Sequence, residues 1–240
     1  MNKSDYEQYV KLSSIPLRKI DRSLMPIAIA SGCLIDYEEK RIMLAVQHAT
    51  GDMGDWAAEI RFEPKKGTKL YRLGAMHFLK SLNINDMVTK DVDFSYVSVP
   101  SDFVSYFQEI EPNGNIVSET SRVICSQSID PEPDKTELFG FSGQVMPKRS
   151  GQFFLTHHRT YLGLKYLRQE EDYYVFKLPI EHPGHEHFQG CSGAPIIDKK
   201  GNTVALVCWG DDRKNLIYGI SIKKYKIAID ITYGKLSNST

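Results

Sequence analysis

The sequence predicts an all-β protein built from many short antiparallel strands. Three observations support this prediction: runs rich in β-branched and aromatic residues, frequent turn signals between them, and very little helical periodicity. Of the 240 residues, 41% are apolar and 25% are charged, as in ordinary soluble domains. The length suits one large β domain or two small lobes, and the pattern indicates an antiparallel barrel or sandwich.

The strand candidates follow one another along most of the chain. Residues 27–37 and 40–47 are separated by two glutamates and predict a hairpin. Helices are expected only at 5–13, with Ser4 as the N-cap, and at 223–234, ended by Gly234. The remaining candidate strands span residues 58–62, 93–99, 122–128, 137–145, 160–167, 173–178, 194–198, 203–210 and 215–222.

Proline-rich breaks divide this pattern. They fall at residues 110–115 and 129–135, and the second is the predicted linker between two lobes. We therefore expect an N-terminal segment (1–25), a first β unit (26–128) and a second β unit with the C-terminal helix (129–240).

The charge balance argues against nucleic-acid and membrane-surface partners. Lys+Arg and Asp+Glu number 30 each, whereas proteins that bind duplexes or anionic lipids usually carry a basic excess. No apolar run is long enough to cross a bilayer, and the N-terminus lacks a secretory apolar region. We therefore expect a cytoplasmic protein whose four cysteines are reduced, with no nucleic-acid or membrane partner.

The stretch "FQGCSGAPIID" places Ser192 between small residues and suggests a nucleophile. A serine nucleophile needs a base, a group that orients the base, and donors for an oxyanion. His48 follows an apolar strand, and Asp93 begins another. The order His, Asp, Ser is one of the chain orders of the serine triad.

These motifs resemble those of the chymotrypsin/trypsin-like serine peptidases. "GCSGAP" matches the family's G-x-S-G-G-P except at one glycine, while "VQHAT" and "DFSYVSV" resemble the base and acid motifs. "LVCWG" resembles the strand ending in Ser-Trp-Gly, with Cys208 in place of serine. The resemblance covers residues 26–234 and implies two antiparallel six-stranded-type β-barrels with short N- and C-terminal helices.

The resemblance implies a serine endopeptidase that works through an acyl-enzyme. His48 would be the base, Asp93 would hold its tautomer, and Ser192 would attack the peptide carbonyl. The backbone N–H groups of Gly190 and Ser192 would form the oxyanion hole. The expected partner is a protein or peptide substrate, and no cofactor or metal is implied.

The specificity pocket is expected from the loop before Ser192 and from the Trp-Gly strand. Counting six positions back from the serine makes Glu186 the pocket floor, which would favour Arg or Lys at the cleavage site. A single gap would put His185 or His187 there instead and favour Glu or Gln. The expected substrate-binding residues are Glu186, His187, Gln189, Cys208, Trp209 and Gly210.

Cys191 marks a departure from the family pattern. Secreted members often carry an aspartate there, which pairs with a freed N-terminus after zymogen cleavage. We therefore expect no trypsin-style activation. We hypothesise that an activating partner protein or the N-terminal segment controls the activity of the peptidase.

Several alternatives stay open. Asp91 is the rival for the acid, and Ser192 alone could be a turn residue, whereas Pro195 argues against an α/β-hydrolase elbow. The loop histidines (His182, His185 and His187) could bind zinc only if the loop folded suitably. A catalytically poor relative that binds a peptide or partner protein, within a defence or stress assembly, is the alternative function.

Overall fold

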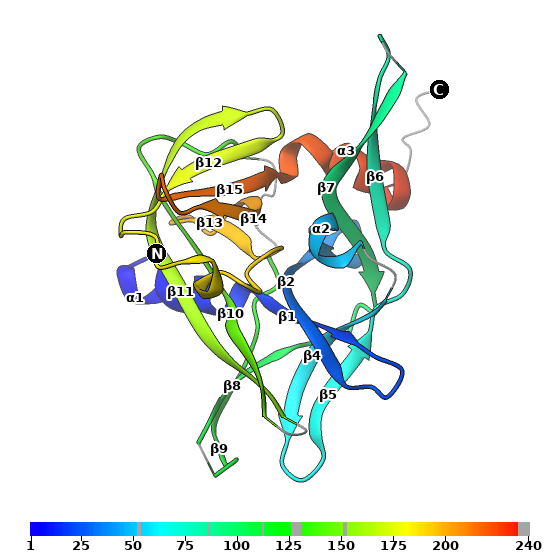
Figure 1. The fold of residues 1–240 in the computed structure, drawn as a ribbon, viewed down its shortest axis with the longest axis vertical. Coiled ribbons are helices and arrows are strands. Elements are labelled where there is room, and N and C mark those ends of the chain that lie inside the picture. The colour runs from blue at the N-terminus through cyan, green and yellow to red at the C-terminus, as the bar shows by residue number, and fades with distance from the viewer. Residues whose placement is uncertain (52–53, 86, 112, 126–130, 151–152, 235–240) are drawn as a thin grey trace.

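The computed structural model confirms the all-β class (Figure 1). The structure describes residues 1–51, 54–85, 87–111, 113–125, 131–150 and 153–234. The helices are α1 (Lys3–Ser13), α2 (Gln47–Thr50), the 3₁₀ turn η1 (His185–His187) and α3 (Ile222–Tyr233). The strands are β1 (Ile15–Ile20), β2 (Pro26–Tyr37), β3 (Lys40–Ala45), β4 (Asp55–Glu63), β5 (Gly67–Arg72), β6 (His77–Asn83), β7 (Val88–Val99), β8 (Tyr106–Ile110), β9 (Ile116–Ser121), β10 (Leu138–Ser150), β11 (Phe153–Glu170), β12 (Tyr173–Lys177), β13 (Pro195–Asp198), β14 (Thr203–Asp211) and β15 (Leu216–Ser221).

The first lobe is a seven-stranded antiparallel sheet. Its strand order is β5-β4-β1-β2-β3-β7-β6, and β2 and β3 form the predicted hairpin. The sheet wraps around an apolar core that includes Leu17, Met43 and Trp56, although its strand pairing does not close into a ring. Strand β1 lies in the middle of this sheet and pairs with β2 and β4, so residues 15–20 belong to this lobe rather than to a separate N-terminal segment.

The second lobe is a closed six-stranded barrel. Its strands are ordered β10-β11-β12-β15-β14-β13, all neighbours in this order pair antiparallel, and the ring is completed by β13 against β10. The barrel interior is filled by large apolar side chains, among them Phe139, Phe141 and Phe176. Closure leaves no unpaired sheet edge along most of these strands, which stabilises a small β lobe.

A third apolar cluster joins the two lobes. It contains Leu44 of β3 and Phe94 of β7 from the first lobe, and Leu206 of β14, Ile220 of β15 and Ile229 of α3 from the second. All five side chains are almost fully buried. The seam between the lobes is therefore a packed core, which fixes the strand ends on either side of it.

Helix α1 packs on the second lobe. The Tyr6 hydroxyl donates to the Ile197 carbonyl at 2.8 Å, and the Ser142 hydroxyl donates to the Val10 carbonyl at 2.7 Å. The N-cap is Asn2, whose side chain accepts the Asp5 N–H, rather than the expected Ser4. The C-terminal helix α3 was predicted correctly in type and position, and Ser221 caps it.

Some strands were not anticipated, and one expectation was wrong. Strands β1, β5, β6, β8 and β9 were missed. A strand was expected at residues 122–128, but residues 122–125 form only an isolated bridge between Ile124 and Leu34. Residues 126–128 lie outside the described residues, and so do residues 129–130 at the start of the expected linker.

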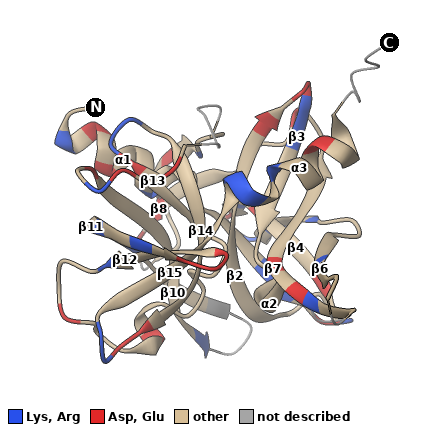
Figure 2. Ribbon diagram, turned by 90° about the horizontal axis from the view of Figure 1, so that it is seen from above, with Lys and Arg blue, Asp and Glu red and all other residues tan. Residues whose placement is uncertain are grey.

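Acidic and basic residues are interspersed over both lobes (Figure 2). In the described part of the chain, no helix has the length and apolar character needed to cross a bilayer.

Docking of α1 makes a testable contribution to stability. Tyr6 is 4% exposed, so Tyr6→Ala should lower the free energy of unfolding by about 3 kcal/mol through the lost apolar burial and the cavity left behind. Glu7→Ala, at an exposed position of the same helix, should change it by less than about 0.5 kcal/mol. Urea unfolding of both variants measures the difference. Equal effects would show that α1 is not packed on the barrel.

Candidate functional site

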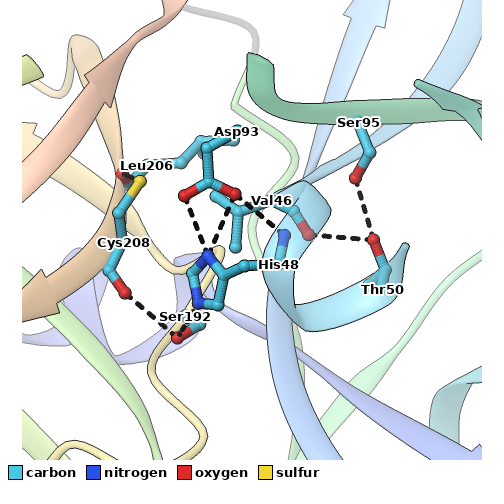
Figure 3. Close-up of polar contacts among 8 residues, drawn as sticks. All are labelled: Val46, His48, Thr50, Asp93, Ser95, Ser192, Leu206 and Cys208. Carbon is cyan, nitrogen blue, oxygen red and sulfur yellow. Dashed lines mark hydrogen bonds and ion pairs between the residues drawn. The ribbon is translucent and has the colours of Figure 1, made fainter. Parts of the chain in front are cut away.

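His48 lies in the single helical turn α2, which directly follows the buried end of β3 (Figure 3). Thr50, in the same turn, donates to the Val46 carbonyl at 2.9 Å and lies 3.0 Å from the Ser95 hydroxyl of β7. These bonds fix α2 against β7. The turn therefore holds the His48 ring at the seam between the lobes, with its side chain 46% exposed.

Asp93 of β7 binds His48 through two groups of that residue. Its Oδ1 accepts the His48 backbone N–H at 2.9 Å, and its two carboxylate oxygens lie 2.9 and 2.8 Å from His48 Nδ1. Asp91, the rival candidate, instead faces Lys80 in an exposed ion pair at 3.5 Å. The structure therefore brings Asp93, and not Asp91, to the histidine.

The environment of Asp93 favours its charged form. Burial by itself would raise the pKa of this carboxyl, but the hydrogen bonds and charge of His48 outweigh it and lower the pKa below its usual value. A carboxylate can only accept hydrogen bonds, so the His48 Nδ1 that faces it carries the proton. Whenever the ring is uncharged, the lone pair of Nε2 lies on its opposite side.

Ser192 lies on that opposite side, in the loop between η1 and β13. Its Oγ is 3.0 Å from His48 Nε2 and 3.3 Å from the carbonyl oxygen of Cys208 (Figure 3). The carboxylate, the imidazole and the hydroxyl thus form one continuous chain of hydrogen bonds. Two members come from the first lobe and one from the second.

The turn around Ser192 has a backbone shape that only glycine adopts without strain at two positions. Gly190 has φ +102° and Gly193 has φ +89°. A Cβ on Gly190 would lie 2.3 Å from the Gln144 carbonyl oxygen, and one on Gly193 would lie 2.0 Å from the Ser31 carbonyl oxygen. Both glycines are therefore required by backbone conformation and by the close approach of neighbouring strands.

The backbone N–H groups of the turn fall into two sets. Those of Cys191, Gly193 and Ala194 donate to carbonyl oxygens at 2.8 Å each. Within the described part of the chain, the N–H groups of Gly190 and Ser192 have no acceptor. Two donors beside the Ser192 hydroxyl are therefore unengaged.

Cys208 lies beside the other face of Asp93. Its buried thiol donates to the Leu206 carbonyl at 3.5 Å (Figure 3). Burial raises the pKa of this thiol well above its usual value, so the thiol stays protonated and adds no negative charge beside the acid.

Cys191 is unsuited to act as a nucleophile. Its side chain is fully buried, and burial raises the pKa of its thiol to about 12. All four cysteines are free and buried, so a disulfide between Cys191 and Cys208 is absent from this structure.

A cleft of about 370 Å³ opens beside Ser192. Its lining contains most of the predicted substrate-binding residues: Glu186, Gln189, Cys208, Trp209 and Gly210. His187 is not part of this lining, whereas His185 is. The sequence could not resolve this choice because it depends on how the loop 181–189 turns.

The interior of the cleft is apolar. Phe188, Val207 and Ile217 form its walls, and each is less than 9% exposed. The Glu186 side chain is 72% exposed and lies 3.8 Å from His187, so this carboxylate is at the rim and is not a buried floor charge. The idea that Glu186 forms the pocket floor is therefore not supported by its placement.

His182 is a polar group that sequence reasoning treated only as a loop histidine. It is buried behind the cleft, with its ring 4.7 Å from that of Phe188 and its Nε2 beside Gly210. Nδ1 accepts the Gly184 N–H, and within the described residues Nε2 has no partner. Burial lowers the pKa of this histidine. Across the described residues, no set of three or more His, Cys, Asp or Glu side chains is arranged to hold a metal ion.

The comparisons with known proteins rest on structure. No family model and no curated protein matches the sequence. A serine endoprotease from Yersinia pestis matches with TM-score 0.57 and 11% identity over 98% of this chain and 68% of its own. A human heparin binding protein matches with TM-score 0.58 and 10% identity over 98% and 95%. A scabies mite inactivated protease paralogue matches with TM-score 0.57 and 10% identity over 96% and 95%.

These similarities show the fold. The chain has the double-lobed all-β fold of the chymotrypsin/trypsin-like serine proteases, as its motifs predicted. Identities near one tenth do not transfer an activity, and two of these three matching structures are named as a binding protein and an inactivated paralogue.

The close approach at Gly193 can be tested against a matched glycine. Gly193→Ala adds both left-handed strain and a clash with the Ser31 carbonyl, and should lower the free energy of unfolding by at least about 3 kcal/mol. Gly114→Ala has a similar φ of +86° but nothing within 4 Å, and should cost only about 1 kcal/mol. Urea unfolding compares the two. Equal losses would mean that the lobes do not meet closely at this turn.

Proposed function

We propose that this chain is a serine endopeptidase that cleaves peptide bonds with His48, Asp93 and Ser192. The observation that carries the proposal is the hydrogen-bonded chain from Asp93 through both ring nitrogens of His48 to the Ser192 hydroxyl. It is the arrangement that general-base activation of a serine requires, with the correct tautomer already set by the acid.

In the first half of the reaction, Ser192 Oγ attacks the peptide carbonyl carbon while His48 Nε2 takes the hydroxyl proton. Asp93 stabilises the imidazolium that results. The tetrahedral intermediate then breaks its C–N bond, and the leaving amine receives the proton from Nε2. The products are an acyl-enzyme ester on Ser192 and a free amine.

In the second half, water takes the place of the amine. His48 Nε2 removes a proton from water as the water oxygen attacks the ester carbonyl, and then returns that proton to Ser192 Oγ as the ester bond breaks. A carboxylic acid leaves and the enzyme regains its starting state. In both halves the carbonyl oxygen becomes negative, and the unengaged N–H groups of Gly190 and Ser192 are the donors suited to stabilise it.

A peptide would bind along the open edge of β14. Pairing of β14 with β13 ends at Leu206, so residues 208–211 have no strand partner on the side of Ser192 within the described part of the chain. Trp209 of this edge is braced by stacking on Tyr218, with ring centroids 5.0 Å apart. An extended substrate can add to such an edge as a further strand, which favours an endopeptidase over a hydrolase of small esters.

A second candidate is a catalytically poor module that binds a peptide or a partner protein. The observation in its favour is that the same fold occurs in a heparin binding protein and in an inactivated protease paralogue. The same cleft and strand edge would then serve for binding alone.

A fluorophosphonate probe distinguishes the two functions. Wild-type protein should be labelled once, with intact mass and peptide mapping locating the adduct on Ser192, and labelling should be lost in Ser192→Ala and His48→Ala. Asp93→Asn should slow labelling by about 10⁴-fold, because the wrong tautomer of His48 is then favoured. Asp91→Asn is the matched control and should label at the wild-type rate.

Absence of labelling in well-folded wild-type protein, both purified and in cell lysate, would contradict the peptidase and leave the binding module. Labelling that survives Asp93→Asn but is lost in Asp91→Asn would show that the assignment of the acid is wrong.

The composition of the cleft predicts the side chain preferred at the cleavage site. Lys or Arg would lose hydration among Phe188, Val207 and Ile217 without meeting a buried carboxylate. Peptide-library profiling should therefore show cleavage after uncharged side chains at least about tenfold better than after Lys or Arg. Glu186→Gln should leave this preference unchanged. A strong basic preference that Glu186→Gln abolishes would refute this reading of the cleft.

A further inference from the structure

The turn that carries Ser192 is held from the opposite lobe by one residue of β2, Ser31. The Ser31 hydroxyl donates to the Gly190 carbonyl at 2.7 Å, and the Ser31 backbone N–H donates to the Ser192 carbonyl at 2.8 Å. Ser31 is 1% exposed, so both bonds are shielded from water. Ser31 therefore binds the turn on both sides of Cys191.

These bonds fix the peptide planes next to the free donors. The plane between Gly190 and Cys191 is held at both ends, because Cys191 N–H donates to the Phe188 carbonyl while the carbonyl of Gly190 accepts from Ser31. Glycine at positive φ has other conformations of similar energy, so its backbone needs such a restraint to stay in one of them. Rotating this plane would break two hydrogen bonds in a dry environment.

In the described part of the chain, no charged side chain bonds to this turn. Secreted members of the resembling family often carry an aspartate before the serine, whereas Cys191 is fully buried and packed under Gly143. Among the described residues, no ion pair involves residues 189–193. Within the described residues, the Ser31 hydroxyl is the side-chain group from outside the turn that bonds to the turn's backbone.

We propose that Ser31 is a positioning residue that keeps the N–H groups of Gly190 and Ser192 aimed at the reacting carbonyl oxygen without any activating cleavage. This inference rests on the proposed peptidase function. Loss of one oxyanion donor lowers kcat by about 10²–10³-fold in another protease, so a partly misaimed turn should cost about 10- to 100-fold.

The test compares Ser31→Ala with Ser142→Ala. Ser142 is an equally buried serine that donates at 2.7 Å to a carbonyl, Val10, but in the contact between α1 and β10. Ser31→Ala should slow fluorophosphonate labelling and lower kcat on a cleaved library peptide by about 10- to 100-fold, with KM unchanged. Ser142→Ala should keep wild-type rates. Melting temperatures should fall by similar amounts, which separates positioning from a loss of folding.

Hydrogen exchange provides a readout that needs no chemistry. In the Ser192→Ala background, Ser31→Ala should speed amide exchange in the segment 186–194 by about tenfold or more, while Ser142→Ala should leave it unchanged. Equal labelling and equal exchange in the Ser31→Ala and Ser142→Ala proteins would overturn the proposal. A wild-type protein that never labels, with the exchange difference intact, would refute the peptidase and leave the restraint standing.

Discussion

The packed seam between the two lobes is the constraint on which the candidate site depends. His48 and Asp93 come from the first lobe and Ser192 from the second, so a 3.0 Å contact between His48 Nε2 and Ser192 Oγ exists only if both lobes are fixed relative to each other. The shared core that includes Phe94, Leu206 and Ile229 provides this rigidity, because close-packed interiors resist displacement. A shift of 1 Å along the seam would break the hydrogen-bonded chain without unfolding either lobe.

Small residues at the seam follow from the same constraint. The backbone of β2 approaches the serine turn so closely that a Cβ on Gly193 would meet the Ser31 carbonyl oxygen, and a Cβ on Gly143 would meet the Cys191 sulfur. Cys191 and Cys208 fit because a thiol is compact and tolerates full burial. The cysteines that look like departures from the sequence pattern are therefore compatible with a tightly packed site.

The parts predicted from sequence were those with strong local signals. The hairpin of β2 and β3, the barrel strands and the trio of His48, Asp93 and Ser192 lie in apolar runs or in a distinctive serine motif. Strands β5 and β9 were missed because their side chains are largely exposed and carry no alternating pattern. The contacts that Ser31 makes with the serine turn join segments far apart in the chain, for which a single sequence has no local signal. The same is true of β1, whose place in the sheet is set by pairing with β2 and β4.

Within the described residues, the serine turn is held by an uncharged bond from the Ser31 hydroxyl to the Gly190 carbonyl. An ion pair at such a turn exists only after its partner charge is released, and it changes with pH and salt. A buried bond from a neutral hydroxyl to a carbonyl needs neither, because neither group titrates near neutral pH and water is excluded. Because Ser31 belongs to the first lobe and the turn to the second, movement of one lobe against the other would break this bond. A partner that binds across the seam could cause such movement, whereas a change in ionisation at the turn could not.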